Sequence, residues 1–271
     1  MKNYPTVRNR HGETRQEPPL AGDARRQIHD PQTAFRNASA FTLIEMLVVI
    51  AVIGILAALI FPVVGAVERR QYINHARAEM AQLEAAIERY KAVYGFYPPS
   101  NQITTDPLTH RFLISQLYYE LTGVTNVAPS GLPLYQSLDN PNLPTLKNTD
   151  VQSIFGVGGF VNCSQPAGSE DATLARDFLP DLRSAQIVSG ITNHPAKKEP
   201  PVTLLVTSVG GPFANYAPLG THDANPWRYN SLNPTNNPGS YDLWVQLVIE
   251  VGQTDLICNW TRQVQINNPL P

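Results

Sequence analysis

The chain has 271 residues, of which 42% are hydrophobic and 15% charged, and its formal net charge at pH 7 is −2. A near-neutral chain lacks the basic surface that nucleic-acid binding normally needs, and two cysteines cannot form a dense disulfide scaffold or a four-cysteine zinc site. The mean hydropathy of −0.20 excludes a polytopic membrane protein.

The beginning of the chain joins a basic segment to an apolar one. Residues 1–40 carry seven basic and four acidic side chains, a net charge of +3, and show no apolar periodicity. Residues 46–67 contain no charge and no side-chain amide or hydroxyl. A helix over this run spans roughly 33 Å, which is enough to cross a bilayer. The positive-inside rule then places residues 1–40 in the cytoplasm and the rest of the chain across the membrane.

Glu45 lies at the start of this apolar run, where a carboxylate costs on the order of 2.5 to 3.5 kcal/mol if it sits at mid-membrane. Residues 40–45 read Ala-Phe-Thr-Leu-Ile-Glu and lead into MLVVIAVIGILAALIFP. This segment resembles the N-terminus shared by type IV pilins and type II secretion pseudopilins. The resemblance implies cleavage between Ala40 and Phe41, N-methylation of Phe41, and an assembly role in which Glu45 meets the terminal amine of a neighbouring subunit. Ala40 stands where the family usually has Gly, so slower cleavage is expected.

The same resemblance implies partners and a location. The partners are a prepilin peptidase, further copies of the chain and other pilins or pseudopilins in a filament, an inner-membrane assembly platform, and membrane lipid before assembly. Nucleic acid is not among them. The location is the bacterial inner membrane with a single crossing and the head in the periplasm, and then a periplasmic or extracellular filament. The residues also leave a simpler role open for Glu45, in which its carboxylate only reaches the lipid headgroups.

Residues 68–94 are apolar on one side only. Apolar side chains recur at spacings of three and four residues, namely Ile73, Ala76, Met80, Leu83, Ile87, Tyr90 and Tyr94. This spacing predicts an amphipathic helix that packs on a sheet. Gly95 and the prolines after it end the predicted helix, while Gly54 and Pro62 are expected to bend it.

The resulting organisation has three parts. Residues 1–40 are a cytoplasmic leader, and residues 41–94 form one long helix whose first part, 41–67, crosses the membrane. Residues 95–271 form an extracytoplasmic head with eight basic and thirteen acidic side chains. The fold class is α+β, with the long helix packed on an antiparallel sheet in the head.

Within the head, the patterns predict short helices and a late sheet. Helices are expected near residues 107–122 and 174–189, and only turns and short apolar pieces between 124 and 161. Strands are expected over residues 202–209, which read VTLLVTSV, and over residues 241–251, where Leu243, Val245, Leu247, Ile249 and Val251 alternate with the side chains of the other face.

A two-residue turn at Gly252 and Gln253 would place Leu247 opposite Cys258, so that Cys258 faces the core. Cys258 could then form a disulfide with Cys163, or both could remain buried free thiols.

Short aromatic segments of the head also resemble major pseudopilins. They are Tyr-Gly-Phe-Tyr-Pro-Pro at 94–99, Asp-Ala-Asn-Pro-Trp-Arg-Tyr at 223–229, and Tyr-Asp-Leu-Trp at 241–244. The calcium loop of that family has no counterpart in the sequence after residue 244, so no metal is carried over. No cofactor is expected.

The chain contains no nucleophile elbow, Walker motif, zinc-protease motif or C-x-x-C pair, and an enzyme is not predicted. The sequence therefore predicts a structural filament subunit, with a type II secretion pseudopilin as the first interpretation. The alternatives are a type IV pilus subunit for adhesion, motility or DNA uptake, and a signal-anchored periplasmic enzyme or binding domain.

Overall fold

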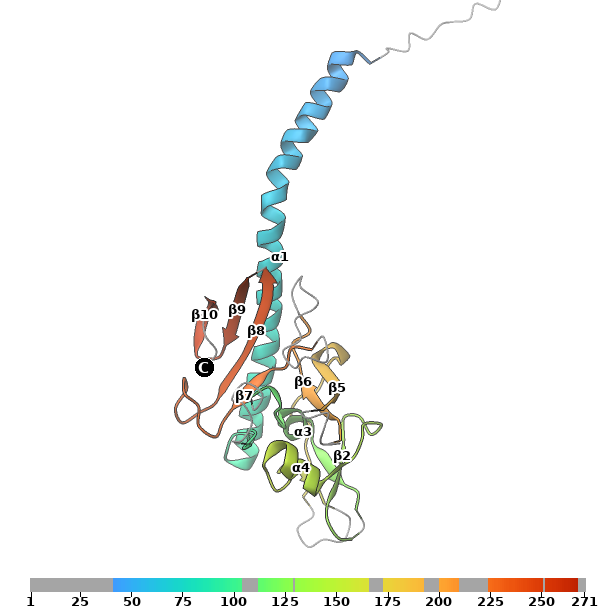
Figure 1. Cartoon of the computed structure of the whole chain (residues 1–271), viewed down its shortest axis with the longest axis vertical. Helices are drawn as coiled ribbons and strands as arrows, with labels where there is room; N and C mark the ends of the chain where they lie inside the picture. The colour runs from blue at the N-terminus through green and yellow to red at the C-terminus, as the bar shows by residue number, and fades with distance from the viewer. Residues whose placement is uncertain are drawn as a thin grey trace, which may run out of the picture. The chain divides into compact units, whose positions relative to one another are not determined.

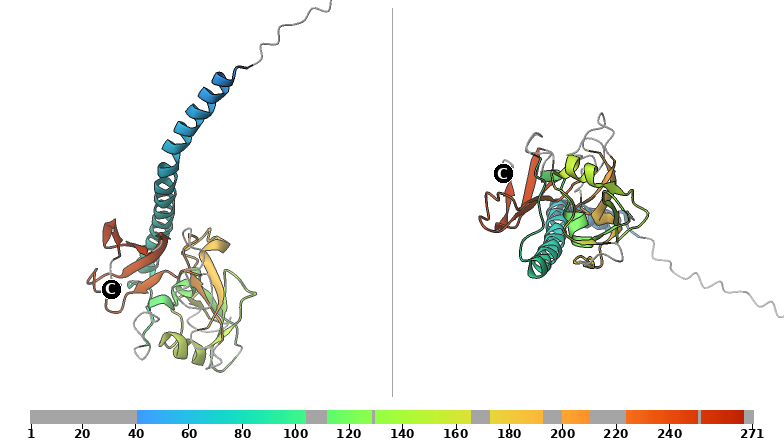
Figure 2. Two further views of the ribbon diagram at one scale, coloured as in Figure 1. Left: turned by 45° about the horizontal axis from the view of Figure 1, so that its top comes forward. Right: turned by 90° about the horizontal axis from the view of Figure 1, so that it is seen from below.

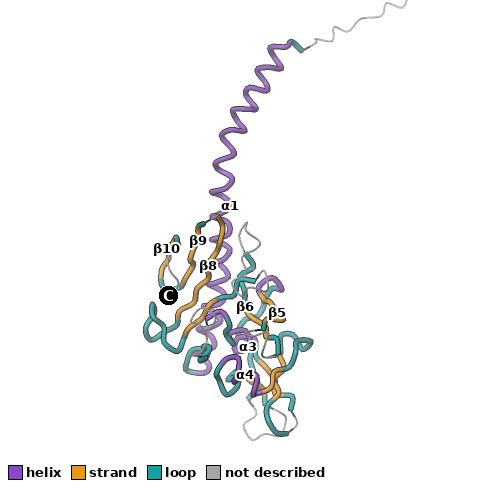
Figure 3. Tube along the Cα trace, viewed as in Figure 1, coloured by secondary structure: helices purple, strands orange, loops and turns teal. Residues whose placement is uncertain are grey.

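Figure 1 shows the computed structural model of the chain, which describes residues 41–103, 112–128, 130–165, 173–192, 200–209, 224–250 and 252–267. The chain divides into two compact units, residues 1–54 and 55–271. Figure 3 separates the helices from the strands along the trace. The fold is mixed helix and sheet with mainly antiparallel pairing, as the α+β prediction expected.

Helix α1 (Leu43–Tyr94) is the longest element and contributes residues to both units. It ends at Gly95, which has a φ of +83° and donates its N–H to the Lys91 carbonyl at 2.8 Å. Glycine adopts this left-handed conformation without steric cost, and the prolines that follow prevent continuation. Among the residues that the structure describes, no helix combines the length and the apolar character needed to cross a membrane.

A four-stranded antiparallel sheet packs beside α1 in the second unit, in the order β10-β9-β8-β7. Its strands are β7 (Arg228–Asn230), β8 (Asp242–Glu250), β9 (Gln253–Cys258) and β10 (Thr261–Ile266). The apolar stripe of α1 shares one buried cluster with Leu243, Val245 and Leu247 of β8. The predicted packing of the stripe is therefore confirmed.

The opposite face of this sheet carries a smaller cluster. Trp244, Leu256 and Cys258 are buried there, with Phe112 and Trp260 packed against them. The ring centroid of Trp244 lies 5.2 Å from that of Phe112 and 5.9 Å from that of Trp260. Both faces of the sheet are thus covered around Trp244, which explains why β8 carries large apolar side chains on both sides there.

The predicted register of β8 and β9 is wrong. Glu250 pairs with Gln253, so Gly252 is the second residue of the turn, with a φ of +75°, and not the first. The register also shifts between Leu247 and Glu250, so that Leu247 lies opposite Asp255. Because side chains alternate along a strand, a displacement by an odd number of residues reverses the face of every partner.

Cys258 consequently pairs with Trp244 and lies in the smaller cluster, whereas Cys163 lies in the main core. The two cysteines are free thiols, and both are buried. Burial raises the pKa of the Cys163 thiol to about 11 and also raises the pKa of Cys258. Of the two alternatives, the structure has the buried thiols and not the disulfide.

A second sheet has the order β3-β2-β1-β4, with one parallel pair between β1 and β4. Its strands are β1 (Val124–Asn126), β2 (Leu134–Ser137), β3 (Leu146–Lys147) and β4 (Cys163–Ser164), and helix α4 (Asn148–Phe155) follows β3. The expectation of turns alone over residues 124–161 is wrong. These strands have two to four residues, too few for an alternating pattern to be recognised.

Two helix predictions in the head also need correction. The first residues of the predicted helix at 107–122 lie outside the described part, and its end is α3 (Leu117–Thr122), separated from residues 112–113 by a non-helical stretch. Residues 174–189 contain no α-helix but the 3₁₀ helix η1 (Ser184–Gln186) and the start of β5 (Ile187–Ile191), which pairs with β6 (Val202–Leu205). Pro180 and the left-handed Asp181 interrupt any helix there.

Candidate functional site: the exposed apolar segment and the helix clasp

The first turns of α1 expose apolar side chains in every direction around the helix. In the first unit the exposed fractions include 83% for Leu43, 67% for Ile50 and 58% for Ile53. The other large apolar residues from Met46 to Val52 are also exposed. Burying such a side chain contributes about 1.5 to 3 kcal/mol. A contiguous apolar surface of this kind indicates an interaction site, with protein or with lipid.

Glu45 and Thr42 form a capping box at the start of α1. The Thr42 backbone N–H and hydroxyl each donate to Glu45 Oε2 at 2.8 Å, and the Glu45 N–H donates to Thr42 Oγ1 at 3.3 Å. These bonds satisfy two of the N–H groups that a helix leaves unpaired at its start. The Thr-x-x-Glu spacing before an apolar run is the sequence signal for this motif. Sequence reasoning assigned Glu45 to assembly and missed its local role.

The other predicted residues of this segment are only partly described. Ala40 lies outside the described residues, while Phe41 is 75% exposed at the edge of the helix. Gly54 lies within α1, and a Cβ added there would meet no atom within 4 Å. The side chain of Pro62 is not described. Cleavage after Ala40, methylation of Phe41 and a bend at Gly54 or Pro62 stay predictions.

Within the second unit, buried polar groups hold α1 to the head. Arg69 donates from Nε and Nη2 to the two carboxylate oxygens of Asp255 on β9, at 2.9 and 2.7 Å. The Asp255 side chain is only 1% exposed and Arg69 is 33% exposed. Paired bonds of this geometry fix orientation as well as distance. The contact anchors α1 two residues beyond the apolar run.

Glu120 on α3 is the most deeply buried carboxylate of this contact region. It accepts hydrogen bonds from the Tyr90 hydroxyl at 2.9 Å and from the N–H groups of Val161 and Asn162 at 3.0 and 3.1 Å. Burial raises the pKa of Glu120, and the three donors oppose that rise. One side chain therefore joins α1 to α3 and to the loop before β4.

Glu79 is a third buried carboxylate at the α1 surface. It accepts hydrogen bonds from the hydroxyls of Thr207 and Ser208, and its Oε1 lies 3.5 Å from His75 Nε2. The periodicity of α1 would place a glutamate at this position in solvent. The approach of residues 207–208 explains why Glu79 is buried. We name the three contacts made by Arg69, Glu120 and Glu79 the helix clasp.

The aromatic segments of the head have structural roles. Trp227, Tyr229 and Tyr241 are buried, and the Tyr229 hydroxyl donates to the Pro98 carbonyl at 2.8 Å. Asp242 accepts the backbone N–H groups of residues 235, 236 and 237, which closes the loop between β7 and β8. Among the described residues, no three His, Cys, Asp or Glu side chains gather as metal ligands.

Comparison with known proteins points to the same N-terminal segment. Residues 35–61 match the family model described as the prokaryotic N-terminal methylation motif. This match and the relatives below support a protein of the type IV pilin and pseudopilin family, and they confirm the resemblance seen in the sequence.

The chain is 37% identical over 67 residues to the type II secretion system core protein G of Pseudomonas aeruginosa, and 36% identical over 67 residues to that of Aeromonas hydrophila. In both cases the match covers 25% of this chain and 47% of the relative, so the chain spans about half the length of the curated relatives it matches. No solved structure matches the chain.

Proposed function

We propose that the chain is a structural subunit of a pilus-like filament, of the type II secretion pseudopilin class. The observation that carries the proposal is the exposed apolar start of α1, which lies within the methylation motif at residues 35–61. Both relatives are type II secretion system core proteins, which supports the secretion class over other pilin-like roles.

In the proposed mechanism, residues 1–40 are removed by a prepilin peptidase between Ala40 and Phe41, and the new Phe41 amine is methylated. The apolar segment at 41–67 resides in the inner membrane before assembly, with the head on the periplasmic side. Lipid covers the apolar side chains at that stage, and the α1 segments of neighbouring subunits cover them in the filament. Extraction then requires the assembly platform and other pseudopilins as partners.

Glu45 has two tasks in this proposal. Its Oε2 caps its own helix through Thr42, while Oε1 makes no hydrogen bond among the described residues. The second oxygen is therefore available for the Phe41 amine of a neighbouring subunit. An ion pair in an apolar filament core removes two charges that are each costly alone, and so favours one register between subunits.

The decisive experiment is the N-terminal mass of the protein extracted from membranes. An N-methylated Phe41 at the start of a 231-residue chain is the expected result, since 40 of the 271 residues are removed. An intact segment 1–40 would refute filament assembly by this route and favour an anchored periplasmic domain. Loss of secretion on gene deletion, with surface pili unchanged, would separate the secretion role from a type IV pilus role.

A further inference from the structure

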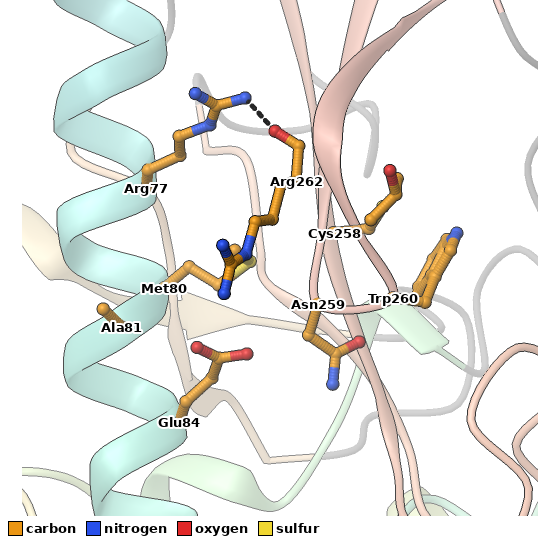
Figure 4. Close-up of a pocket in the computed structure, with 9 residues that line it drawn as sticks. Arg77, Met80, Ala81, Glu84, Cys258, Asn259, Trp260 and Arg262 are labelled. Atoms are coloured by element: carbon orange, nitrogen blue, oxygen red, sulfur yellow. Dashed lines mark hydrogen bonds between the residues drawn. The ribbon is translucent and has the colours of Figure 1, made fainter.

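A groove lies between α1 and the β9–β10 turn, within the second unit. Its volume is about 560 Å³. Figure 4 shows Arg77, Met80 and Glu84 reaching from α1 toward the hairpin, with the Arg262 side chain extending down beside Met80. An Arg77 Nη atom donates to the Arg262 carbonyl at 2.6 Å and closes one end. Met80 and Ala81 give the groove an apolar floor.

The charge of this groove is net positive. Arg77 and Arg262 provide two cations, and neither has a carboxylate within 4.0 Å among the described residues. Glu84 provides one acid, and burial, followed by the nearby Glu88, raises the pKa of Glu84. A complementary partner would present a carboxylate to the arginines and an apolar side chain to the floor.

The same chain carries such a segment, residues 174–182, which we name the ridge. Leu174 is 81% exposed, the largest value for a large hydrophobic side chain among the described residues of the second unit. Asp177 and Asp181 of the same segment are exposed, and Arg176 is the ridge's one cation. The ridge thus has two acids and one base, where the groove has two bases and one acid.

The ridge is held firmly by the rest of the head. Phe178 and Leu179 are buried, and Phe178 donates its N–H to the Leu121 carbonyl at 2.8 Å. Arg89 of α1 donates to the Phe178 carbonyl, also at 2.8 Å. A surface that is ordered before binding loses little conformational entropy when it docks. The exposed Leu174 therefore projects from a fixed base.

Groove and ridge contact α1 at different positions, and the ridge leads toward β5 in the chain. Figure 1 places β8–β10 on one side of α1 and β5 and β6 on the other, and the left view of Figure 2 agrees. The groove touches α1 at Ala81, and the ridge touches it at Arg89. Eight helical residues separate these positions, which is about 12 Å along the helix axis.

We propose that the ridge of a second copy of this chain docks into the groove of the first, with Leu174 over Met80 and Ala81 and the ridge aspartates facing Arg77 and Arg262. Because two different surfaces meet, the contact is heterologous and can repeat from copy to copy. The axial offset makes the repeat advance along α1, which generates an open helical array and not a closed ring. The inference rests on the proposed filament function and names the head contact between its subunits.

Cysteine crosslinking in the full-length protein tests this contact directly. Ala81→Cys combined with Leu174→Cys should give a disulfide-linked ladder of this chain in membranes or filaments. The matched control is Ala81→Cys with Leu132→Cys, because Leu132 is also exposed, at 70%, but lies outside the ridge. Each single variant controls for crosslinks to the two native thiols. Absence of the first ladder, equal yield from the control, or a crosslink to a different protein would overturn the proposal.

Charge reversal supplies a second readout that does not depend on a thiol. Arg262→Glu should lower the yield of the ladder about tenfold, since an attractive pair becomes repulsive. Adding Asp177→Arg to the same chain should restore the yield of the ladder, because the charges of the pair are then opposite again. Filaments and a methylated Phe41 without the ladder would refute the docking contact and leave the proposed function intact. A ladder without processing at Phe41 would support the docking contact and refute the proposed function.

Discussion

Helix α1 contains two stretches with large apolar side chains, one apolar all around the helix and one apolar on a single side, and the two meet opposite conditions. Between Leu43 and Ile53 its large apolar side chains are exposed, and no part of the first unit that the structure describes covers them. Between Ile73 and Tyr90 the apolar stripe is buried, and two buried carboxylates, Glu79 and Glu120, fix the same stretch to the head. A third buried carboxylate, Asp255, holds Arg69 just before it. Apolar side chains alone therefore do not tell whether a stretch of helix is packed against the rest of the fold. Buried polar contacts mark the part that the fold holds in place.

The largest expected contrast comes from one substitution made in both stretches. Ile87→Ala should lower the free energy of unfolding by about 3 kcal/mol, because Ile87 is fully buried and leaves a cavity. Ile50→Ala should change it by less than about 0.5 kcal/mol, because Ile50 is exposed. Urea titration of the detergent-solubilised protein, followed by tryptophan fluorescence, measures both. All three tryptophans lie in the head.

Filament assembly should depend on the exposed stretch, so there the larger effect is expected from Ile50→Ala. Ile50→Ala is expected to reduce filament formation under electron microscopy while the head stays folded. Equal losses of unfolding free energy from the two variants would contradict the division of α1 into an exposed and a supported stretch.

The helix clasp gives the next largest effect. Glu120→Ala should lower the free energy of unfolding by about 2.5 kcal/mol, because it leaves the buried donors of Tyr90 and Asn162, and the part-buried N–H of Val161, without an acceptor. Glu88→Ala is the matched control, since Glu88 is exposed, and it should stay within about 0.5 kcal/mol of the parent. A loss from Glu120→Ala no larger than that of the control would show that the clasp does not stabilise the head.

The smallest expected effect is a pH dependence of the difference in unfolding free energy between the parent and Glu120→Ala. Burial raises the folded-state pKa of Glu120 above the unfolded value of about 4.3. The folded state therefore binds a proton more tightly, so the contribution of Glu120 is fully present below about pH 4.3 and declines as the pH rises through the folded pKa. The difference in unfolding free energy between the parent and Glu120→Ala should shrink from pH 4 to pH 8. A difference that grows over this range would contradict the raised pKa.

Much of the molecule follows from local sequence patterns. The family segment at residues 40–61, the apolar stripe of residues 73–94, its stop at Gly95 and the strands near 202 and 242 are all recognisable without coordinates. Each depends on residues within one or two turns of a helix or within one strand, so periodicity and turn chemistry are sufficient. The capping box of Thr42 and Glu45 was also recognisable by its spacing.

The remaining features depend on contacts between distant residues. The irregularity between Leu247 and Glu250 reverses the face of Cys258, and the short strands between 124 and 164 exist only because they pair with one another. Glu79 sits at a position that helical periodicity assigns to solvent until residues 207–208 cover it. Sequence by itself determined where α1 begins and ends, and which of its residues are apolar. Only the tertiary structure decided which of those residues are supported, because burial and hydrogen bonding are set by neighbours that lie far away in the chain.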